Sequence, residues 1–241
     1  MFETNNSESS GSIENVDEQN GFYNVDYPEI SEEFEPISFV DLLAFAYQIA
    51  NGMRHLTSMS YVHRQLALRN VYISHDKTIR IGELGLARRH GNNEYYRIMN
   101  KAVPLPFHWM APETFKDHKF TEKSDVWSFA VCLWELFTLG RVPYEGLADV
   151  LTFLNEGKRL EKPEFCSEAT YNLMRSCWEL DASKRPCFSH CVTFFEEQLK
   201  KQDTEVFADL FQKLEIVSLH QEQLQDWTNG SNFDNDSGDS V

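Results

Sequence analysis

The sequence has no long hydrophobic run and few cysteines. No window approaches the roughly 18 consecutive apolar residues that a membrane span requires, and the first ten residues have neither a basic start nor an apolar stretch, so no signal peptide is predicted. As written, the chain is therefore expected to be cytoplasmic. The cysteines lack paired metal-ligand spacing, which favours reduced thiols in or near the core over a metal centre. They are Cys132, Cys166, Cys177, Cys187 and Cys191.

Basic residues are scarce at both ends of the chain. Residues 1–36 carry 10 acidic side chains and no lysine or arginine, and residues 202–241 carry 9 acidic side chains and one lysine, Lys213. The net charge of −16 belongs to these ends, because residues 37–201 hold 19 acidic and 21 basic side chains. A protein without a basic stripe is a poor candidate for binding nucleic acid or an anionic membrane surface, and neither partner is predicted.

The acidic segment 1–36 has no periodic apolar pattern. Such a composition buries too little surface to offset the entropy of ordering, so the segment is predicted to be disordered. Its tyrosines Tyr23 and Tyr27 leave two interpretations open. They belong to an ordinary polar tail, or they are phosphorylation sites, with Tyr27 and the Pro-Glu-Ile that follows it shaped like a phosphotyrosine docking motif.

Ordered structure is predicted to begin at Pro36. Ser38 and Asp41 look like a capping box, and apolar residues at helical spacing after them predict a helix of about five turns that starts at Phe39. Two β-branched runs, 71–73 and 78–81, flank a polar turn and predict a hairpin.

A buried helix and several flanking helices complete the predicted fold. Residues 124–139 are apolar on nearly every face, which is typical of a buried central helix. Residues 88–108 are predicted to form a long loop. Residues 204–227 predict an amphipathic helix that either folds back on the domain or binds a partner, and an acidic disordered tail follows it. Helical patterns also occur near 147–156, near 167–178 and, after a proline at the helix start, over 188–200.

Five motifs, in order along the chain, resemble those of protein tyrosine kinases. They are the catalytic loop at 61–70 (Y-V-H-R-Q-L-A-L-R-N), the start of the activation segment at 81–88, its W-M-A-P-E end at 109–113, the S-D-V-W-S-F of a buried helix at 124–129 and an arginine–proline pair in 183–186.

The resemblance is closest to receptor tyrosine kinases with a split kinase domain, in which an acidic insert like residues 1–36 precedes this region. It implies a mainly α-helical fold, the C-terminal lobe of a protein kinase over residues 37–200, with a short β-hairpin and without the β-rich N-terminal lobe. The remaining residues, 201–241, are assigned to the amphipathic helix and the tail.

The chemical positions depart from the family pattern. Gln65 stands where the resemblance places the catalytic base, and a neutral amide has no useful basicity near pH 7. Glu83 stands at the position of the Mg²⁺ aspartate with a longer side chain, whereas Arg69 and the second metal ligand, Asn70, are retained. Tyr72 replaces the leucine under the adenine, and its ring is expected to take part of that space.

The structural positions of the family are kept. By the resemblance, His63 and Leu84 stack apolar contacts toward the buried helix, and Asp125 accepts hydrogen bonds from the backbone of the catalytic loop. Glu113 and Arg185 are expected to form a buried ion pair.

The resemblance also implies regulatory residues. Arg64 matches the arginine that binds a phosphorylated activation segment, and Tyr95 and Tyr96 match the tyrosines that carry the phosphate. Both tyrosines are either solvent-facing aromatics or substrates of another kinase.

Residues 1–36 contain no glycine-rich loop and no β3 lysine motif. ATP and Mg²⁺ are therefore implied by resemblance only, and no cofactor is expected for the chain as written. The sequence favours a catalytically impaired tyrosine-kinase-like module in phosphotyrosine signalling. Its partner would be a kinase of the same family or a phosphotyrosine-binding protein. Two alternatives stay open: part of a receptor kinase at the plasma membrane that transfers phosphate from ATP to protein tyrosine, or a truncated product without function.

Overall fold

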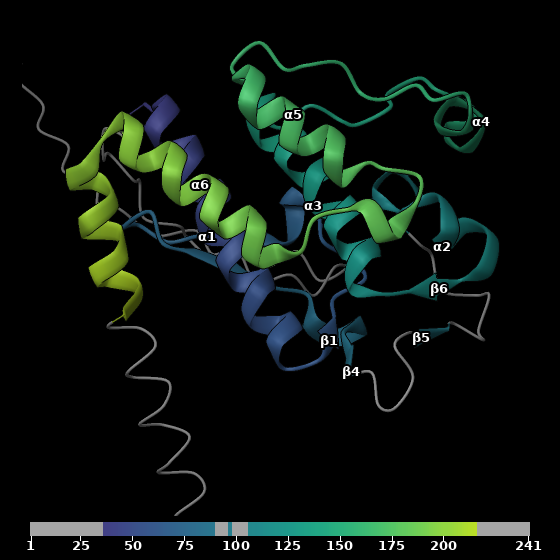
Figure 1. Cartoon of the computed structure of the whole chain (residues 1–241), viewed down its shortest axis with the longest axis horizontal. Coiled ribbons are helices and arrows are strands. Elements are labelled where there is room, and N and C mark those ends of the chain that lie inside the picture. The colour runs from purple at the N-terminus through teal and green to yellow at the C-terminus, as the bar shows by residue number, and fades with distance from the viewer. Residues whose placement is uncertain (1–35, 90–95, 98–105, 216–241) are drawn as a thin grey trace, which may run out of the picture. The chain divides into compact units, whose positions relative to one another are not determined.

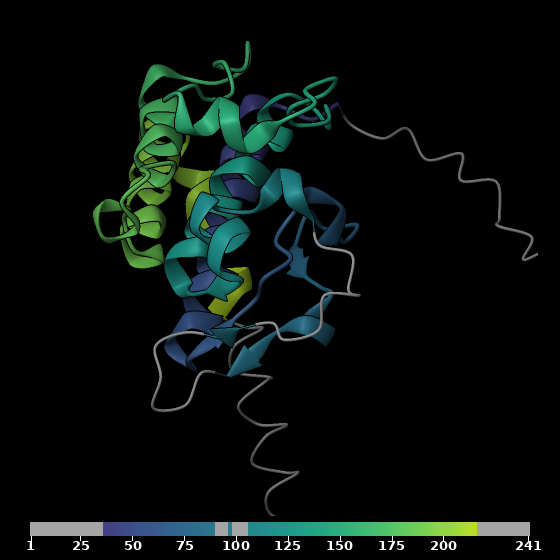
Figure 2. The same ribbon diagram turned by 90° about the vertical axis from the view of Figure 1, so that its right-hand side faces the viewer.

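The computed structural model describes residues 36–89, 96–97 and 106–215. Four long helices dominate them: α1 (Phe39–Ser58), α3 (Glu122–Phe137), α5 (Glu168–Cys177) and α6 (Phe188–Gln202). Helix α3 packs between α1 and α5, and α6 runs alongside α1 (Figure 1 and Figure 2). This is the mainly helical architecture of a kinase C-terminal lobe, as the sequence predicts.

The remaining elements are short. Two single-turn helices are α2 (Pro112–Asp117) and α4 (Val150–Asn155), and four 3₁₀ turns are η1 (Leu68–Asn70), η2 (Leu84–Leu86), η3 (Phe107–Trp109) and η4 (Ala182–Lys184). The strands are β1 (Tyr61–Val62), β2 (Val71–Ile73), β3 (Ile79–Ile81), β4 (Arg88–Arg89), β5 (Tyr96–Arg97) and β6 (Lys119–Phe120). No helix in these ranges is both long and apolar enough to cross a bilayer.

Helix α1 begins with the predicted capping box. The Ser38 hydroxyl accepts a hydrogen bond from Asp41 N (3.1 Å), and Ser38 N donates to the Asp41 carboxylate (2.8 Å), so two backbone donors at the helix start are satisfied. The same carboxylate lies 3.0 Å from Lys77 Nζ, which joins the helix start to the turn between β2 and β3.

Helix α3 is the centre of the core. Fourteen of its 16 residues are buried, which confirms the central helix expected from its all-round hydrophobicity. It begins two residues earlier than predicted, because Thr121 and Ser124 form a capping box that the sequence reading did not use.

The strands of the described residues form three separate antiparallel pairs. The predicted hairpin is present as β2 and β3, with Val71 opposite Ile81 and Ile73 opposite Ile79. Strand β1 pairs with β4, and β5 pairs with β6. The predicted long loop at 88–108 therefore contains two strand segments and the turn η3 within its described residues.

The structure corrects two details that were predicted from the sequence. Proline does not open α6, because the N-cap is Cys187 and Pro186 precedes it. Four of the five cysteines are buried, as expected for thiols in the core, but Cys187 is exposed.

A further helix over 204–215 folds back on the domain. Phe207 and Leu210 are each 8% exposed, and the Phe207 ring meets Tyr47 of α1 edge to face at 6.0 Å. Within the described residues this supports the fold-back interpretation of the amphipathic segment. The rest of that segment lies outside the described residues.

This packing predicts a graded effect of truncating the two aromatic residues on the 204–215 helix. Phe207→Ala should lower the free energy of unfolding by about 3 kcal/mol, since it removes a buried ring and leaves a cavity beside Tyr47. Phe211→Ala is the matched control, because Phe211 is 46% exposed, and it should change stability by less than about 1 kcal/mol. Urea unfolding of both variants measures this, and equal losses would contradict the fold-back packing.

Candidate functional site

The loop after β1 is held by a buried carboxylate at the start of α3. His63 N donates to Asp125 Oδ2 (2.7 Å) and Arg64 N donates to Asp125 Oδ1 (2.9 Å). Arg64 adopts a left-handed conformation (φ 74°), which turns two successive N–H groups toward one carboxylate. The Asp125 contacts expected from the resemblance are thus present.

Burial shifts the pKa of two titratable groups here, Asp125 beneath the loop and His63 within it. Asp125 is 1% exposed, and burial raises its pKa to about 7 even though the two backbone donors oppose the shift. His63 is fully buried, and burial lowers its pKa below the usual range. Its Nε2 lies 2.9 Å from the carbonyl oxygen of Gly82, which links the loop to the end of β3.

The family's chemical positions lie together at the end of the loop. Asn70 Nδ2 donates to the carbonyl oxygen of Gln65 (2.7 Å), and Gln65 N donates to His63 Nδ1 (3.3 Å). These contacts hold the backbone of residue 65 while its amide side chain supplies no acid or base. Arg69 does not join them, since its guanidinium lies 4.1 Å from the centre of the Trp109 ring.

Glu135 is a site residue that was not predicted from the sequence. Its Oε2 accepts hydrogen bonds from Leu68 N (2.9 Å) and from Trp109 Nε1 (2.7 Å), and the side chain is buried in α3. It therefore joins the loop to the W-M-A-P-E segment. A glutamate within an otherwise apolar buried helix was the available signal, because a buried carboxylate requires donors.

The residue at the position of the family's Mg²⁺ ligand, Glu83, lies on the surface. Glu83 is exposed and left-handed (φ 56°), and it follows Gly82, over which the Tyr72 ring packs so closely that a Cβ on Gly82 would overlap it. Tyr72 itself is 53% exposed. The ring therefore lies on the surface next to Glu83.

The described residues do not fit a resident metal site. They contain no cluster of three or more His, Cys, Asp or Glu side chains arranged for a metal ion. Asn70 commits its amide nitrogen to Gln65, which leaves one amide oxygen and the exposed Glu83 carboxylate as candidate ligands. Mg²⁺ with so few protein oxygens is held mainly by substrate phosphates.

The expected stack through Leu84 is wrong. Leu84 is 48% exposed and lies in the surface turn η2, directly after the left-handed Glu83. His63 instead makes its link through the Gly82 carbonyl oxygen.

The ion pair between the W-M-A-P-E segment and η4 is bidentate. Arg185 Nη1 and Nη2 lie 2.6 and 2.9 Å from the two carboxylate oxygens of Glu113. The Arg185 side chain is fully buried and also donates to the carbonyl oxygens of Glu179 and Lys123. The guanidinium is therefore fixed in one orientation.

The regulatory positions are placed only in part. The Arg64 guanidinium lies 5.2 Å from the centre of the Phe120 ring, and Phe120 pairs with Tyr96 across β5 and β6. Tyr95, Tyr23 and Tyr27 lie outside the described residues.

The buried and exposed ion pairs should respond differently to neutralisation. Glu113→Gln leaves the buried Arg185 without its charged partner and should cost about 3 kcal/mol or more of unfolding free energy. Glu156→Gln removes a pair with Lys158 in which both side chains are more than half exposed, and should cost under about 1 kcal/mol. Chemical denaturation compares them, and similar costs would show that the Glu113 pair is not structural.

Asp125 should impose a pH dependence on stability. Because its native pKa is raised above the unfolded value of 3.8 to about 7, the native state holds a proton that the unfolded state has released. The contribution of Asp125 to the free energy of unfolding is full below about pH 4 and is lost as the pH rises through about 7. The stability advantage of the native protein over Asp125→Asn should therefore shrink between pH 4.5 and 7.5. Urea midpoints across this range measure it, and a growing advantage would mean that Asp125 is ionised in the native state.

Comparison with known proteins agrees with the motifs. A model of the protein tyrosine and serine/threonine kinase family matches residues 15–195. The chain is 46% identical over 216 residues to tyrosine-protein kinase receptor old-1 of Caenorhabditis elegans, covering 86% of this chain and 43% of that protein. It is 44% identical over 201 residues to the receptor-like tyrosine-protein kinase kin-15 of the same organism, covering 82% and 41%.

A more distant relative is a fibroblast growth factor receptor of Halocynthia roretzi, 42% identical over 171 residues, with 70% of this chain and 22% of that protein covered. The chain thus spans less than half the length of these curated relatives. The family model matches well over half of the chain, and the matched residues include all five motifs. The chain belongs to the protein tyrosine and serine/threonine kinase family, and the relatives that it resembles are named as receptor tyrosine kinases.

Proposed function

We propose that this chain is a catalytically impaired tyrosine-kinase-like domain that acts as an interaction or regulatory module in phosphotyrosine signalling. The observation that carries the proposal is Gln65 in a loop whose supports are intact. Asp125 holds the backbone before it and Asn70 holds its carbonyl oxygen. The residue at the base position is therefore well placed, yet it has no proton affinity near pH 7.

The residues at the family's nucleotide and Mg²⁺ positions support the same proposal. In the family, Mg²⁺ and ATP enter together as substrate, and catalysis is almost entirely positioning and charge stabilisation. Glu83 would meet that substrate from an exposed, left-handed residue with one extra methylene, and the Tyr72 ring lies beside it over Gly82. Mg²⁺ demands near-ideal octahedral geometry, so a displaced carboxylate weakens this site.

Exposed apolar side chains near the degenerate positions support a binding role. Tyr72 and Leu84 are 53% and 48% exposed; the Tyr72 ring packs over Gly82, two residues before Leu84. Exposed apolar patches in soluble domains mark interaction surfaces. The partner class we propose is a kinase of the same family or a phosphotyrosine-binding protein.

A second candidate is part of an active receptor tyrosine kinase that transfers phosphate from ATP to protein tyrosine. The observation in its favour is the 46% identity to a protein named as a tyrosine-protein kinase receptor, of which this chain spans 43%. Location at the plasma membrane belongs to this candidate.

A chimaera separates the two candidates. In the chimaera, residues 37–200 of this chain replace the matching region of the old-1 receptor kinase. Tyrosine phosphorylation of a poly(Glu,Tyr) substrate is then measured with Mg²⁺ and ATP. We expect no activity with Gln65 and Glu83, and a gain of about 100-fold or more over background after Gln65→Asp with Glu83→Asp, since general base catalysis is worth about 10²–10⁴.

The single variant Glu83→Asp is the matched control and should remain inactive, because the base is still missing. A chimaera that phosphorylates the substrate efficiently with the native Gln65 would refute catalytic impairment and support the second candidate.

A further inference from the structure

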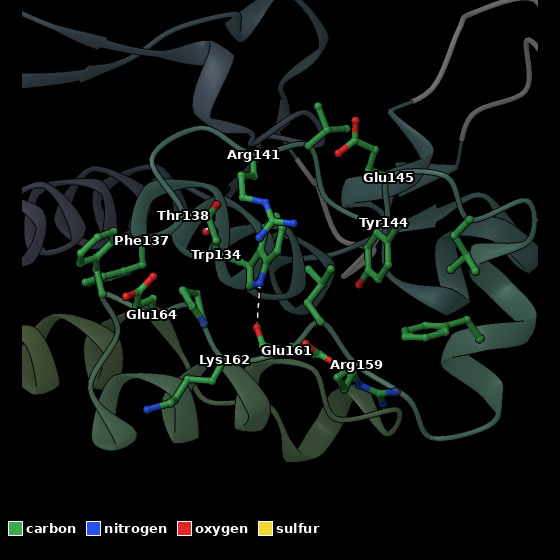
Figure 3. A pocket seen from close by; sticks show the side chains of 16 residues that line it. Trp134, Phe137, Thr138, Arg141, Tyr144, Glu145, Arg159, Glu161, Lys162 and Glu164 are labelled. Carbon is green, nitrogen blue, oxygen red and sulfur yellow. Dashed lines mark hydrogen bonds between the residues drawn. The ribbon is translucent and has the colours of Figure 1, made fainter.

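A pocket of about 630 Å³ opens at the C-terminal end of α3. It is bounded by the segments 141–147 and 159–165 and by Phe153 of α4 (Figure 3). None of its lining residues belongs to the motifs at 61–70 or 81–88. Its volume is within the range of ligand-binding pockets, about 300–1,000 Å³. The pocket is therefore a candidate binding site separate from the catalytic loop.

The interior of the pocket is aromatic and aliphatic. Trp134 is 7% exposed, and its indole Nε1 donates to the backbone carbonyl oxygen of Glu161 (2.9 Å), so this polar atom is already satisfied. Phe137 and Leu160 add further apolar surface to the lining. An apolar group that enters the pocket would therefore release water without breaking a hydrogen bond of Trp134.

The rim of the pocket is apolar as well. Val142 and Phe165 are 51% and 53% exposed, and Leu147 is 36% exposed, so the apolar lining continues out of the pocket onto the surface. A small ligand that fills the pocket would leave these side chains in water. A segment of polypeptide can cover them too and bury more apolar area, so the rim favours a protein partner.

Three carboxylates of the pocket have no partner. Glu145, Glu161 and Glu164 all line it and are exposed, and within the described residues none of their carboxylates accepts a hydrogen bond or forms an ion pair. Glu145 comes from the segment on one side of Trp134, and Glu161 and Glu164 come from the segment on the other side (Figure 3). Cationic groups on both sides of an occupant held over Trp134 would therefore meet a carboxylate.

Two cations of the pocket are already bound to other groups. Arg159 donates twice to the backbone carbonyl oxygen of Trp178 (3.0 and 2.8 Å). Lys162 pairs with Glu168 at 2.8 Å, and Glu168 is not part of the lining. Neither cation forms an ion pair with the three glutamates of the pocket.

Arg141 is the remaining cation among the described lining residues. Its guanidinium lies 5.9 Å from the centre of the Trp134 ring and has no ion-pair partner in the described part of the chain (Figure 3). One unpaired arginine thus stands against three unpaired carboxylates. Residues 141–168 as a whole hold six acidic and four basic side chains, so the surroundings of the pocket are negative and complementary to a basic partner.

We propose that this pocket docks a basic segment of a partner protein, in which an aromatic or aliphatic anchor lies between lysines or arginines. The anchor packs against Trp134 and the exposed ring of Phe165. The flanking cations pair with Glu145 on one side and with Glu161 and Glu164 on the other. The site adds a docking function to the domain and does not depend on whether the domain is catalytically impaired.

The test is the affinity of the full chain for a fluorescein-labelled peptide with one phenylalanine between two pairs of lysines. Fluorescence anisotropy measures it at about 0.15 M salt, where interactions between distant charges are screened. The acidic ends of the chain attract any basic peptide, so the same peptide with serine in place of phenylalanine is the reference. We expect the serine peptide to bind at least about 10-fold more weakly, because it lacks the anchor.

Three variants test the contacts. Glu161→Lys with Glu164→Lys should weaken binding of the phenylalanine peptide at least about 10-fold, because attraction becomes repulsion. Arg141→Gln removes the unpaired cation and should tighten binding about 2-fold or more. Phe165→Ser should weaken binding about 3- to 10-fold with little effect on stability, since this side chain is 53% exposed.

Glu197→Lys with Glu215→Lys is the matched control. It makes the same charge change at two exposed positions outside the pocket and should alter the affinity less than about 3-fold. The proposal is overturned if the phenylalanine and serine peptides bind equally, if a glutamate-flanked peptide binds as well, if Arg141→Gln weakens binding, or if the two double variants behave alike. Binding of 3-phenylpropylamine as tight as that of the peptide would also overturn it, because the occupant would then be a small aromatic amine.

Discussion

Two carboxylates in one buried helix fix the loop on which the candidate site is built. Asp125 and Glu135 lie ten residues apart in α3, about 15 Å along its axis at 1.5 Å per residue. The first binds the backbone N–H groups of His63 and Arg64, and the second binds Leu68 N and the Trp109 indole. Each carboxylate is desolvated, so removing it would leave buried donors unsatisfied as well as a cavity. The loop conformation thus depends on the packing of α3, and α3 is held by its neighbours on both sides.

The contacts that hold the loop do not involve the side chains that would take part in the chemistry. Asp125 and Glu135 accept hydrogen bonds from backbone N–H groups of the loop and from the Trp109 indole. Neither of them contacts the side chain of residue 65 through these bonds. A change from a carboxylate to an amide at that position therefore leaves every anchoring bond in place, and no stability is lost to reveal it. The same holds at Glu83, which is exposed and makes no contact that the core requires. An intact fold in this family is for that reason weak evidence of phosphoryl transfer, and the chemistry has to be judged at the positions that would touch substrate.

The sequence predicted the parts of this molecule that depend on local pattern. The capping box before α1, the all-round apolar run of α3 and the β2–β3 hairpin are each encoded within a few residues. The Asp125 and Glu113 contacts could be predicted only through the family resemblance, because their partners lie about 60–70 residues away in the chain. Glu135 was missed although its place in an all-round apolar helix signals a buried carboxylate, because its donors Leu68 N and Trp109 Nε1 lie far away in the chain. Leu84 was predicted wrongly: it lies exposed in the turn η2 after the left-handed Glu83, a backbone conformation that no pattern in the sequence indicates.

The loop that carries Gln65 and a pocket at the C-terminal end of α3 share this helix without sharing a face. Trp134 lines the pocket and the adjacent Glu135 holds the loop, and successive residues on a helix point about 100° apart. Coupling between the sites would require α3 to move, but 14 of its 16 residues are packed in the core. Close-packed interiors shift between discrete arrangements and do not deform continuously. We therefore expect changes at Trp134 to leave the loop unaltered, whatever the catalytic competence of Gln65.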